Sequence, residues 1–306
     1  MAEPRDPRGT LPENHEHNSL EPIKPSLNAL VLCGGGTRGV IEVGLYRALV
    51  ELKIPIHAIF GTSIGAINGA FIAAGFTPDE MTRLWLKFQK ERLFTFDRRL
   101  FLFRTSKMDG LYRTDRFQRF LGEALPVRRF EELTIPLTVT ATNLQTGEPV
   151  YLNRGEILPA ILASSAIPPY FPPVEYQGYR LADGALVDNV PIGVAVEQGA
   201  TRIFALLCHC AQELQQPTQG VLDITARAFR IAMAQRFRHD LEHYKDRAEL
   251  ILLEPCFDFP PSLLKLELKG VQPLIEQAYQ FTMAKLTRRG FVPASTPSKD
   301  MRRGVN

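Results

Sequence analysis

Cysteine is scarce in this chain, which has only four in 306 residues: Cys33, Cys208, Cys210 and Cys256. Secreted scaffolds held together by disulfides are short and rich in cysteine, so this count excludes that class and we expect reduced thiols. The run Cys208-His209-Cys210 offers two kinds of metal ligand, but zinc sites usually draw on paired clusters, and the sequence has no second one. We therefore expect no metal and no cofactor.

Long apolar runs and a strong charge bias are also missing. No segment approaches the ~18 uninterrupted apolar residues of a membrane-spanning helix. The 36 Lys and Arg residues nearly balance the 33 Asp and Glu residues, and a net charge of +3 is too small to indicate a nucleic-acid partner. Residues 1–26 lack the charged start, apolar stretch and cleavage site of a signal peptide. We expect a soluble, cytoplasmic protein.

Composition divides the chain into three parts. Residues 1–26 are rich in Pro, Glu, Asn, Arg and His, and residues 293–306 are basic and poor in apolar side chains, so we expect both ends to be disordered. Residues 27–292 contain the apolar patterns that a core requires. We expect this stretch to form a single domain.

Short apolar runs alternate with helical patterns through the first part of that domain. Residues 28–33 and 56–60 read as buried strands, and residues 40–52 and 64–74 read as the helices that follow them. Further helices are expected over 77–90, 114–124, 158–165, 192–198, 221–244 and 271–289, and further strands over 135–143, 150–153, 202–208 and 250–254. This alternation predicts a three-layer α/β/α fold with a mostly parallel central sheet.

The second of two glycine-rich turns carries the clearest chemical signal. Gly61-Thr62-Ser63-Ile64-Gly65 matches G-x-S-x-G between a strand and a helix, the nucleophile elbow of serine hydrolases. Glycines two residues away on either side of the serine avoid collisions in the sharp turn that exposes its hydroxyl. Ser63 is therefore the candidate nucleophile. The alternative is a glycine-rich corner with an incidental serine.

The first turn, Gly34-Gly35-Gly36-Thr37-Arg38-Gly39, satisfies the G-x-G-x-x-G pattern of dinucleotide-binding folds. That fold needs an acidic residue at the end of the next strand, but residues 60–63 (FGTS) contain none. A P-loop would need a Lys-Ser or Lys-Thr pair after the glycines, and none follows them. The turn fits an oxyanion hole better, with the amides of Gly35 and Gly36 facing the negative oxygen of an intermediate and Arg38 adding positive charge.

A serine nucleophile needs a base. The chain order Ser63, Asp183, His209 matches the Ser, Asp, His order of an α/β-hydrolase triad. Order alone is weak evidence, because His209 can equally be a polar residue at a strand end and Asp183 a turn aspartate that caps its own backbone.

Several motifs together resemble the patatin-like phospholipases. These are GGGTRG at 34–39, GTSIG at 61–65, ASSAIPPYFPPV at 163–174, and DGA at 183–185 followed by DNVP at 188–191. The resemblance covers about residues 28–191. It implies a Ser63-Asp183 dyad without histidine and an oxyanion hole formed by the first glycine turn, Gly34 included. The remaining motif positions are Gly39, Gly61, Gly65, Gly184 and Ala185, the last of which is glycine in many members.

The activity implied by this resemblance is hydrolysis of fatty acyl esters of lipids through an acyl-enzyme on Ser63. Two alternatives stay open. One is an esterase with a Ser63-Asp183-His209 triad, and the other is a non-catalytic lipid- or nucleotide-binding module on the same fold.

Residues 92–107 combine apolar and cationic side chains. Such a segment suits the surface of an anionic bilayer, so transient membrane contact is expected here. The alternative is a connecting helix whose arginines only extend their charged ends to solvent. The cationic residues are Arg92, Arg98, Arg99, Arg104 and Lys107.

Overall fold

The structure is a computed structural model that describes residues 28–91, 93–97, 109–209, 220–257 and 270–292. The predicted leader at 1–26, the predicted tail at 293–306, Cys210 and most of the 92–107 segment lie outside these residues. Within the described ranges, no helix has the length and apolar composition needed to cross a bilayer.

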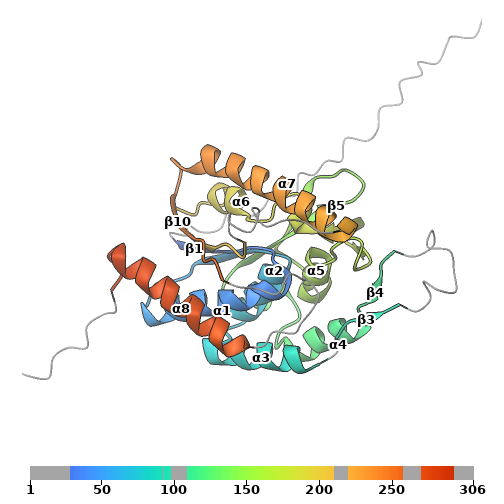
Figure 1. The fold of residues 1–306 in the computed structure, drawn as a ribbon, viewed down its shortest axis with the longest axis horizontal. Helices are drawn as coiled ribbons and strands as arrows, with labels where there is room; N and C mark the ends of the chain where they lie inside the picture. Colours follow the sequence, from blue (N-terminus) through green and yellow to red (C-terminus); the bar gives the residue numbers. More distant parts are fainter. Residues whose placement is uncertain (1–27, 92, 98–108, 210–219, 258–269, 293–306) are drawn as a thin grey trace, which may run out of the picture.

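A mixed central sheet, dominated by parallel strands, runs through the molecule in the order β10-β9-β1-β2-β5-β8-β7 (Figure 1). The parallel strands are β1 (Asn28–Leu32), β2 (Ala58–Thr62), β5 (Leu137–Asn143), β9 (Arg202–Leu206) and β10 (Glu249–Leu253). The antiparallel strands beside β5 are β6 (Pro149–Leu152), β8 (Tyr179–Asp183) and β7 (Val174–Tyr176).

Helices cover both faces of this sheet. In Figure 1, α6 (Ile192–Glu197) and α7 (Gly220–Tyr244) lie on one face, and α1 (Ile41–Glu51), α2 (Ile64–Ala73) and α8 (Val271–Arg288) lie on the other. The remaining helices are α3 (Pro78–Lys90), α4 (Asp115–Ala124) and α5 (Ile157–Ser164). The predicted three-layer α/β/α architecture with a mostly parallel sheet is confirmed.

Helix α3 shows how local sequence determines an element here. The Thr77 hydroxyl accepts a hydrogen bond from the Glu80 amide at 3.3 Å, and the Glu80 carboxylate accepts one from the Thr77 amide at 2.8 Å. Pro78 occupies the first turn, where its missing N–H costs nothing. The helix therefore begins where these residues predicted.

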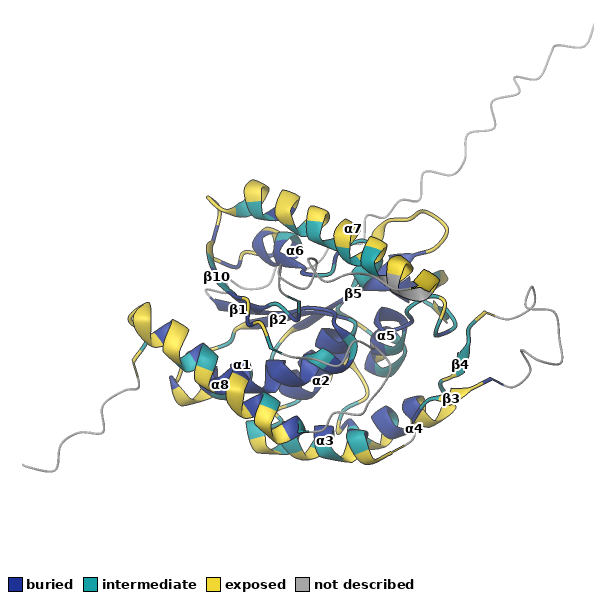
Figure 2. Cartoon of the chain, in the orientation of Figure 1, coloured by how far each residue is buried: buried dark blue, intermediate teal, exposed yellow. Residues whose placement is uncertain are grey.

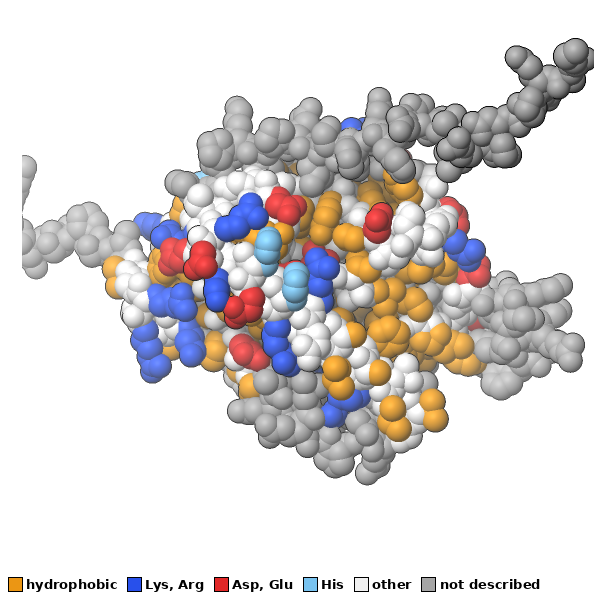
Figure 3. All heavy atoms as spheres, turned by 90° about the horizontal axis from the view of Figure 1, so that it is seen from above, with side chains coloured by type: hydrophobic (Ala, Val, Ile, Leu, Met, Phe, Trp, Pro, Cys, Tyr) orange, Lys and Arg blue, Asp and Glu red, His pale blue; other side chains and the backbone are white. Residues whose placement is uncertain are grey.

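Helices α2 and α7 differ strongly in how far their residues are buried (Figure 2). Every residue of α2 is buried, because its small side chains let it approach the sheet. On α7, by contrast, Val221, Ile224, Phe229 and Ile231 are all exposed. Viewed from above, hydrophobic side chains gather toward one end of this face, and charged side chains and histidines lie toward the other (Figure 3). The helix predicted over 221–244 is thus present, and several apolar side chains of its first half face outward.

The closing helix α8 packs directly on the backbone of α1. A Cβ atom added to Gly44 would lie 2.5 Å from the Ile275 carbonyl oxygen and 2.7 Å from the Ala278 Cβ. Only glycine allows this approach. Helix α8 is therefore fitted to the first helix of the fold, although 219 residues separate the end of α1 from its first residue.

Three features differ from the sequence predictions. Three short strands were not expected: β7, and the pair formed by β3 (Thr95–Phe96) and β4 (Tyr112–Arg113). Runs of two or three residues are too short to show an alternation of apolar and polar side chains. Strand β9 ends at Leu206, before the predicted Cys208. Among the cysteines, Cys33 and Cys208 are free as expected, but Cys256 is disulfide-bonded, so the expectation of reduced thiols is wrong there.

Candidate active site

Ser63 occupies the sharp turn between β2 and α2. Its backbone has φ 56° and ψ −122°, a conformation that costs a residue with a side chain about 1–3 kcal/mol. The flanking glycines make the turn possible. A Cβ at Gly61 would lie 2.6 Å from the Ala66 Cα, and one at Gly65 would collide with the Leu32 carbonyl group of β1. The turn has the geometry of a nucleophile elbow.

Hydrogen bonds from a neighbouring helix fix this turn. The Ser63 amide donates to the Ser164 Oγ at 2.8 Å, and the Ser164 hydroxyl donates to the Thr140 carbonyl oxygen at 2.6 Å. Ser164 belongs to the motif at 163–174, but the motif assigns this serine no role. Its position beside the elbow depends on how α5 packs against β5, which the motif does not reveal.

Asp183 reaches Ser63 from the end of β8. The Ser63 hydroxyl donates to Asp183 Oδ2 at 2.7 Å, and Asp183 Oδ1 accepts from the Ala185 amide at 2.9 Å. The next residue, Gly184, cannot carry a Cβ because it would strike the Thr140 carbonyl group. Both carboxylate oxygens are thus held in fixed directions.

Asp183 is buried, with only 1% of its surface exposed. Burial raises the pKa of its carboxyl group to about 7, although the hydrogen bonds from Ala185 and Ser63 act in the opposite direction. A base with a pKa near neutrality is well matched to proton transfer at physiological pH.

The first glycine turn lies against the elbow. A Cβ at Gly34 would lie 3.2 Å from the Ser63 Cβ and would collide with the Asn189 side chain. The Gly34 amide donates to the Asn189 carbonyl oxygen at 3.3 Å, so this predicted oxyanion donor is already engaged. Within the parts of the chain that the structure describes, the amides of Gly35 and Gly36 donate no hydrogen bond. Gly36 has φ 59° and begins a 3₁₀ turn that leads into α1.

Arg38 and His209 face each other rather than Ser63. Arg38 Nη1 lies 2.9 Å from His209 Nδ1 and donates to the Cys208 carbonyl oxygen at 3.4 Å. Because arginine only donates, Nδ1 is the acceptor of the first contact. The structure thus brings Ser63 and Asp183 into direct contact and places His209 against Arg38. Gly39, another motif position, packs against the elbow, since a Cβ there would lie 2.6 Å from Ile64 Cγ1.

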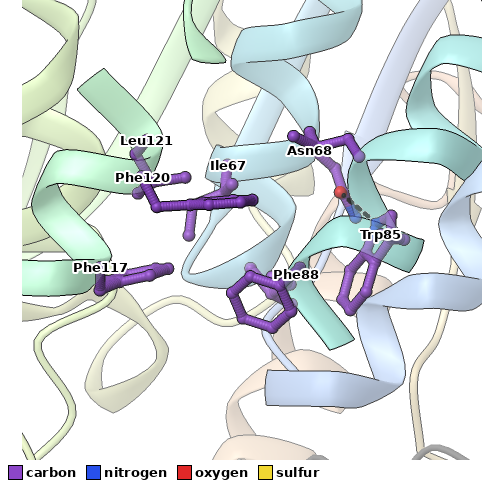
Figure 4. Close-up of a pocket in the computed structure, with 9 residues that line it drawn as sticks. Ile67, Asn68, Trp85, Phe88, Phe117, Phe120 and Leu121 are labelled. Carbon is purple, nitrogen blue, oxygen red and sulfur yellow. Dashed lines mark hydrogen bonds between the residues drawn. The ribbon is translucent and has the colours of Figure 1, made fainter. Parts of the chain in front are cut away.

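An apolar pocket begins beside the elbow (Figure 4). Ile64, the residue after Ser63, forms part of its wall. Among the described residues that line it, Asn68 brings an amide side chain, whose Oδ1 accepts from Trp85 Nε1 at 3.1 Å. The lining residues come from α2, α3 and α4: Ile64, Ile67, Asn68, Leu84, Trp85, Phe88, Phe117, Phe120 and Leu121.

The layered sheet and the serine turn define the class of this chain as an α/β protein with a hydrolase-type elbow. The family model of patatin-like phospholipases matches residues 30–196, more than half of the chain. The chain belongs to this family, as its motifs predicted.

Relatives of known sequence agree with this assignment. The chain is 36% identical over 164 residues to an uncharacterized NTE family protein of Mycobacterium tuberculosis, covering 54% of this chain and 44% of that protein. It is 32% identical over 179 residues to lysophospholipase nte1 of Aspergillus terreus, covering 58% of this chain and 12% of that protein. The matched region thus spans less than half the length of these relatives.

Among solved structures, VipD from Legionella pneumophila is similar with a TM-score of 0.45 and 14% identity, covering 87% of this chain and 67% of that one. The type III effector protein ExoU gives a TM-score of 0.44 at 16% identity, covering 87% of this chain and 53% of that one.

Proposed function

We propose that this chain is a serine lipid acyl hydrolase that cleaves fatty acyl esters with Ser63 as nucleophile and Asp183 as base. The 2.7 Å hydrogen bond between Ser63 Oγ and Asp183 Oδ2 carries this proposal. A serine on a strained elbow that already donates its proton to a buried carboxylate needs no further group to begin the reaction. Family membership and the name of the Aspergillus relative support lipids as the substrate class.

The proposed first step is acyl transfer. Ser63 Oγ attacks the ester carbonyl carbon while Asp183 takes its proton, and the carbonyl oxygen becomes an oxyanion. The amides of Gly35 and Gly36 stabilise that oxyanion, and each such donor is worth on the order of 3 kcal/mol in the transition state. Asp183 then returns the proton to the leaving alcohol, which departs and leaves the acyl group on Ser63.

The second step releases the fatty acid. Water attacks the acyl-enzyme while Asp183 accepts its proton, and the same two amides hold the second oxyanion. Collapse of this intermediate gives Ser63 its proton back and frees the acid. We propose that the apolar pocket that begins at Ile64 holds the hydrocarbon chain, because its wall consists almost entirely of aliphatic and aromatic side chains.

Activity-based labelling tests the nucleophile. We expect a fluorophosphonate probe to label the wild-type chain and to fail on Ser63→Ala, while Asp183→Asn loses both labelling and hydrolysis of lipid esters. Ser165→Ala is the matched control, because the Ser165 hydroxyl donates to the Ile161 carbonyl oxygen of its own helix at 2.7 Å. Labelling that survives in folded Ser63→Ala would refute the proposed nucleophile.

The two alternatives from the sequence give different results in the same assays. A Ser63-Asp183-His209 triad requires His209→Ala to abolish hydrolysis, whereas the dyad retains most of it. The Arg38 contact of His209 and the direct contact of Ser63 with Asp183 both favour the dyad. A folded wild-type chain that neither reacts with the probe nor hydrolyses any ester would instead indicate a non-catalytic binding module.

We also propose transient contact with a membrane surface through residues 92–107, whose cations suit anionic lipid. Binding to vesicles that contain phosphatidylserine should weaken as salt increases. Reversing the charge of Arg98 and Arg99 should reduce binding without changing hydrolysis of a short, water-soluble ester. Vesicle binding that salt and both substitutions leave unchanged would rule out this segment.

A further inference from the structure

Three buried side chains with metal-ligating atoms meet beneath the first glycine turn. Cys33 follows strand β1, Cys208 lies beyond the end of β9, and Glu42 lies on α1. One ligand atom from each lies within 4.8 Å of the other two. Cys208 Sγ and Glu42 Oε1 are 3.8 Å apart. Up to 175 residues separate these side chains along the chain, which is why no local motif reveals them.

Glu42 is an unusual residue for this position. It is completely buried. One carboxylate oxygen, Oε2, accepts from Asn68 Nδ2 at 2.7 Å, and the other, Oε1, lies 3.8 Å from Cys208 Sγ. A carboxyl group is costly to bury, so its place beside two cysteines calls for an explanation.

The two thiols are in contact with each other. The Cys208 amide donates to Cys33 Sγ at 3.2 Å, and the two sulfur atoms lie within 4.8 Å of each other. The thiolate is the form of cysteine that binds metals, and two sulfur atoms at this separation can bind one ion.

We propose that Cys33, Glu42 and Cys208 bind a Zn²⁺ ion. Two thiolates and one carboxylate form a ligand set that zinc accepts and that calcium and magnesium do not prefer. With Zn–S near 2.3 Å and Zn–O near 2.1 Å, tetrahedral ligands lie about 3.6 Å apart, close to the spacing of Cys208 Sγ and Glu42 Oε1. The three protein ligands leave a fourth position for a water molecule.

Charge balance supports the site. Binding would release one proton from each ligand, so that the ion and its three anionic ligands together carry one negative charge. Arg38 supplies the compensating positive charge, since its Nη1 donates to the Cys208 carbonyl oxygen at 3.4 Å. Asn68, bonded to Glu42 Oε2, would orient the carboxylate ligand.

The ion would hold the base of the glycine turn in place. Cys33 immediately precedes Gly34, and a Cβ at Gly35 would lie 2.5 Å from the Cys208 Cβ. The turn is thus attached to one ligand and packed on another. This role is structural, and the metal site stands whether or not the chain is a hydrolase.

Cobalt binding to the full-length chain tests the site without any substitution. After metal is removed with a chelator, titration with Co²⁺ should saturate at one equivalent and produce a thiolate-to-cobalt charge-transfer band. Zinc should then displace the cobalt and abolish the band, and elemental analysis of chain purified without chelator should find zinc. A folded wild-type chain that gives no thiolate-to-cobalt band, or peptide mapping that finds a Cys33–Cys208 disulfide, would overturn the proposal.

Variants assign the ligands. Cys33→Ser and Cys208→Ser should each reduce the charge-transfer band to about half, because one thiolate ligand remains, and the double variant should lose it. Glu42→Gln should keep the packing but weaken cobalt binding by about 100-fold or more. Glu51→Gln, on the same helix, and the double variant Cys210→Ser with Cys256→Ser should leave the band unchanged. A band of unchanged intensity in folded Cys33→Ser, or one that disappears when only Cys210 and Cys256 are replaced, would place the metal elsewhere and refute the site.

Discussion

Ser63 has a strained backbone conformation, and hydrogen bonds from the residues around it hold that conformation. Its positive φ is uncommon for a residue with a side chain. The Ser63 amide is held by Ser164, and the Ser63 carbonyl oxygen accepts from the Ala66 amide at 3.0 Å. Both backbone groups therefore have partners that only the strained conformation provides, which keeps the hydroxyl directed at Asp183.

The pKa of Asp183 predicts how activity depends on pH. In the proposed dyad, Asp183 would act as a base only when ionised, and burial raises its pKa to about 7. The ratio kcat/KM for a lipid ester should therefore rise as pH increases through 7 and level off above it. The measurement is a pH profile at constant ionic strength with an uncharged substrate. A profile that stays flat through neutrality would contradict this assignment of the base.

The raised pKa of Asp183 also makes the free energy of unfolding depend on pH. The folded-state pKa lies above the ordinary value of 3.8, so the native protein binds the proton more tightly than the unfolded chain does. The stabilisation from the protonated Asp183 carboxyl group is fully present below pH 3.8 and is lost as pH rises through 7. This shift corresponds to about 4 kcal/mol. Urea unfolding should show Asp183→Asn gaining stability relative to wild type between pH 5 and pH 8, whereas an unchanged difference would refute it.

Helix α5 positions the elbow from outside the reaction. Ser164→Ala removes the acceptor of the Ser63 amide and the donor to the Thr140 carbonyl oxygen, which should cost about 1–3 kcal/mol of stability. We expect kcat to fall with little change in KM, because the substrate pocket is not touched. Ser165→Ala, next on the chain, should alter neither. Equal kinetics for the two variants would show that Ser164 has no positioning role.

The pocket between α2, α3 and α4 predicts selectivity for acyl chain length. Phe117 and Phe120 line the pocket from α4, and both pack against the Phe88 ring with centroids 6.0 and 5.8 Å away. Phe117→Leu should shift the preferred ester toward longer chains while costing about 1–2 kcal/mol of stability. Phe130→Leu, a buried change outside the pocket lining, is the control. Identical chain-length profiles would place the acyl chain elsewhere.

Elements with local signals were predicted well from the sequence. The capping residues at Thr77 and Glu80 identified the start of α3, and the two glycine turns identified the strand-helix units around them. The helix over 221–244 was also predicted, but its pattern did not reveal that Val221, Ile224 and Phe229 are exposed. Ser164 and Glu42 received no role, because their partners come from distant segments and no spacing along the chain encodes them.

At the scale of the whole molecule, the order of the strands in the sheet brings the residues of the site together. Strand β2 ends next to Ser63, and β8 ends at Asp183, with β5 lying between them in the sheet. The serine and the aspartate lie 120 positions apart along the chain, and the sheet brings their side chains within one hydrogen bond of each other. The sequence predicted that these two residues belong together through family motifs, but their direct contact depends on the antiparallel placement of β8, which was not predicted.

The contact between α1 and α8 predicts an unusual response to alanine. Gly44→Ala puts a Cβ against the Ile275 carbonyl oxygen, so it should destabilise the protein by about 1–3 kcal/mol although alanine favours helices. Gly122→Ala on α4 meets only the Leu158 side chain, at 3.2 Å, and should be neutral or stabilising. Urea unfolding compares the two. A Gly44→Ala variant as stable as wild type would show that α8 does not sit on α1.

That contact also limits how the chain can be cut or recombined. The family match ends at residue 196, yet α8 begins at Val271 and rests on a helix inside the matched region. Separating the chain after the match would remove the helix on which α1 packs at Gly44 and to which Glu51 is hydrogen-bonded through Tyr279. For protein engineering, the boundary of the family is therefore not a boundary of folding, and any shortened version of the chain has to retain α8.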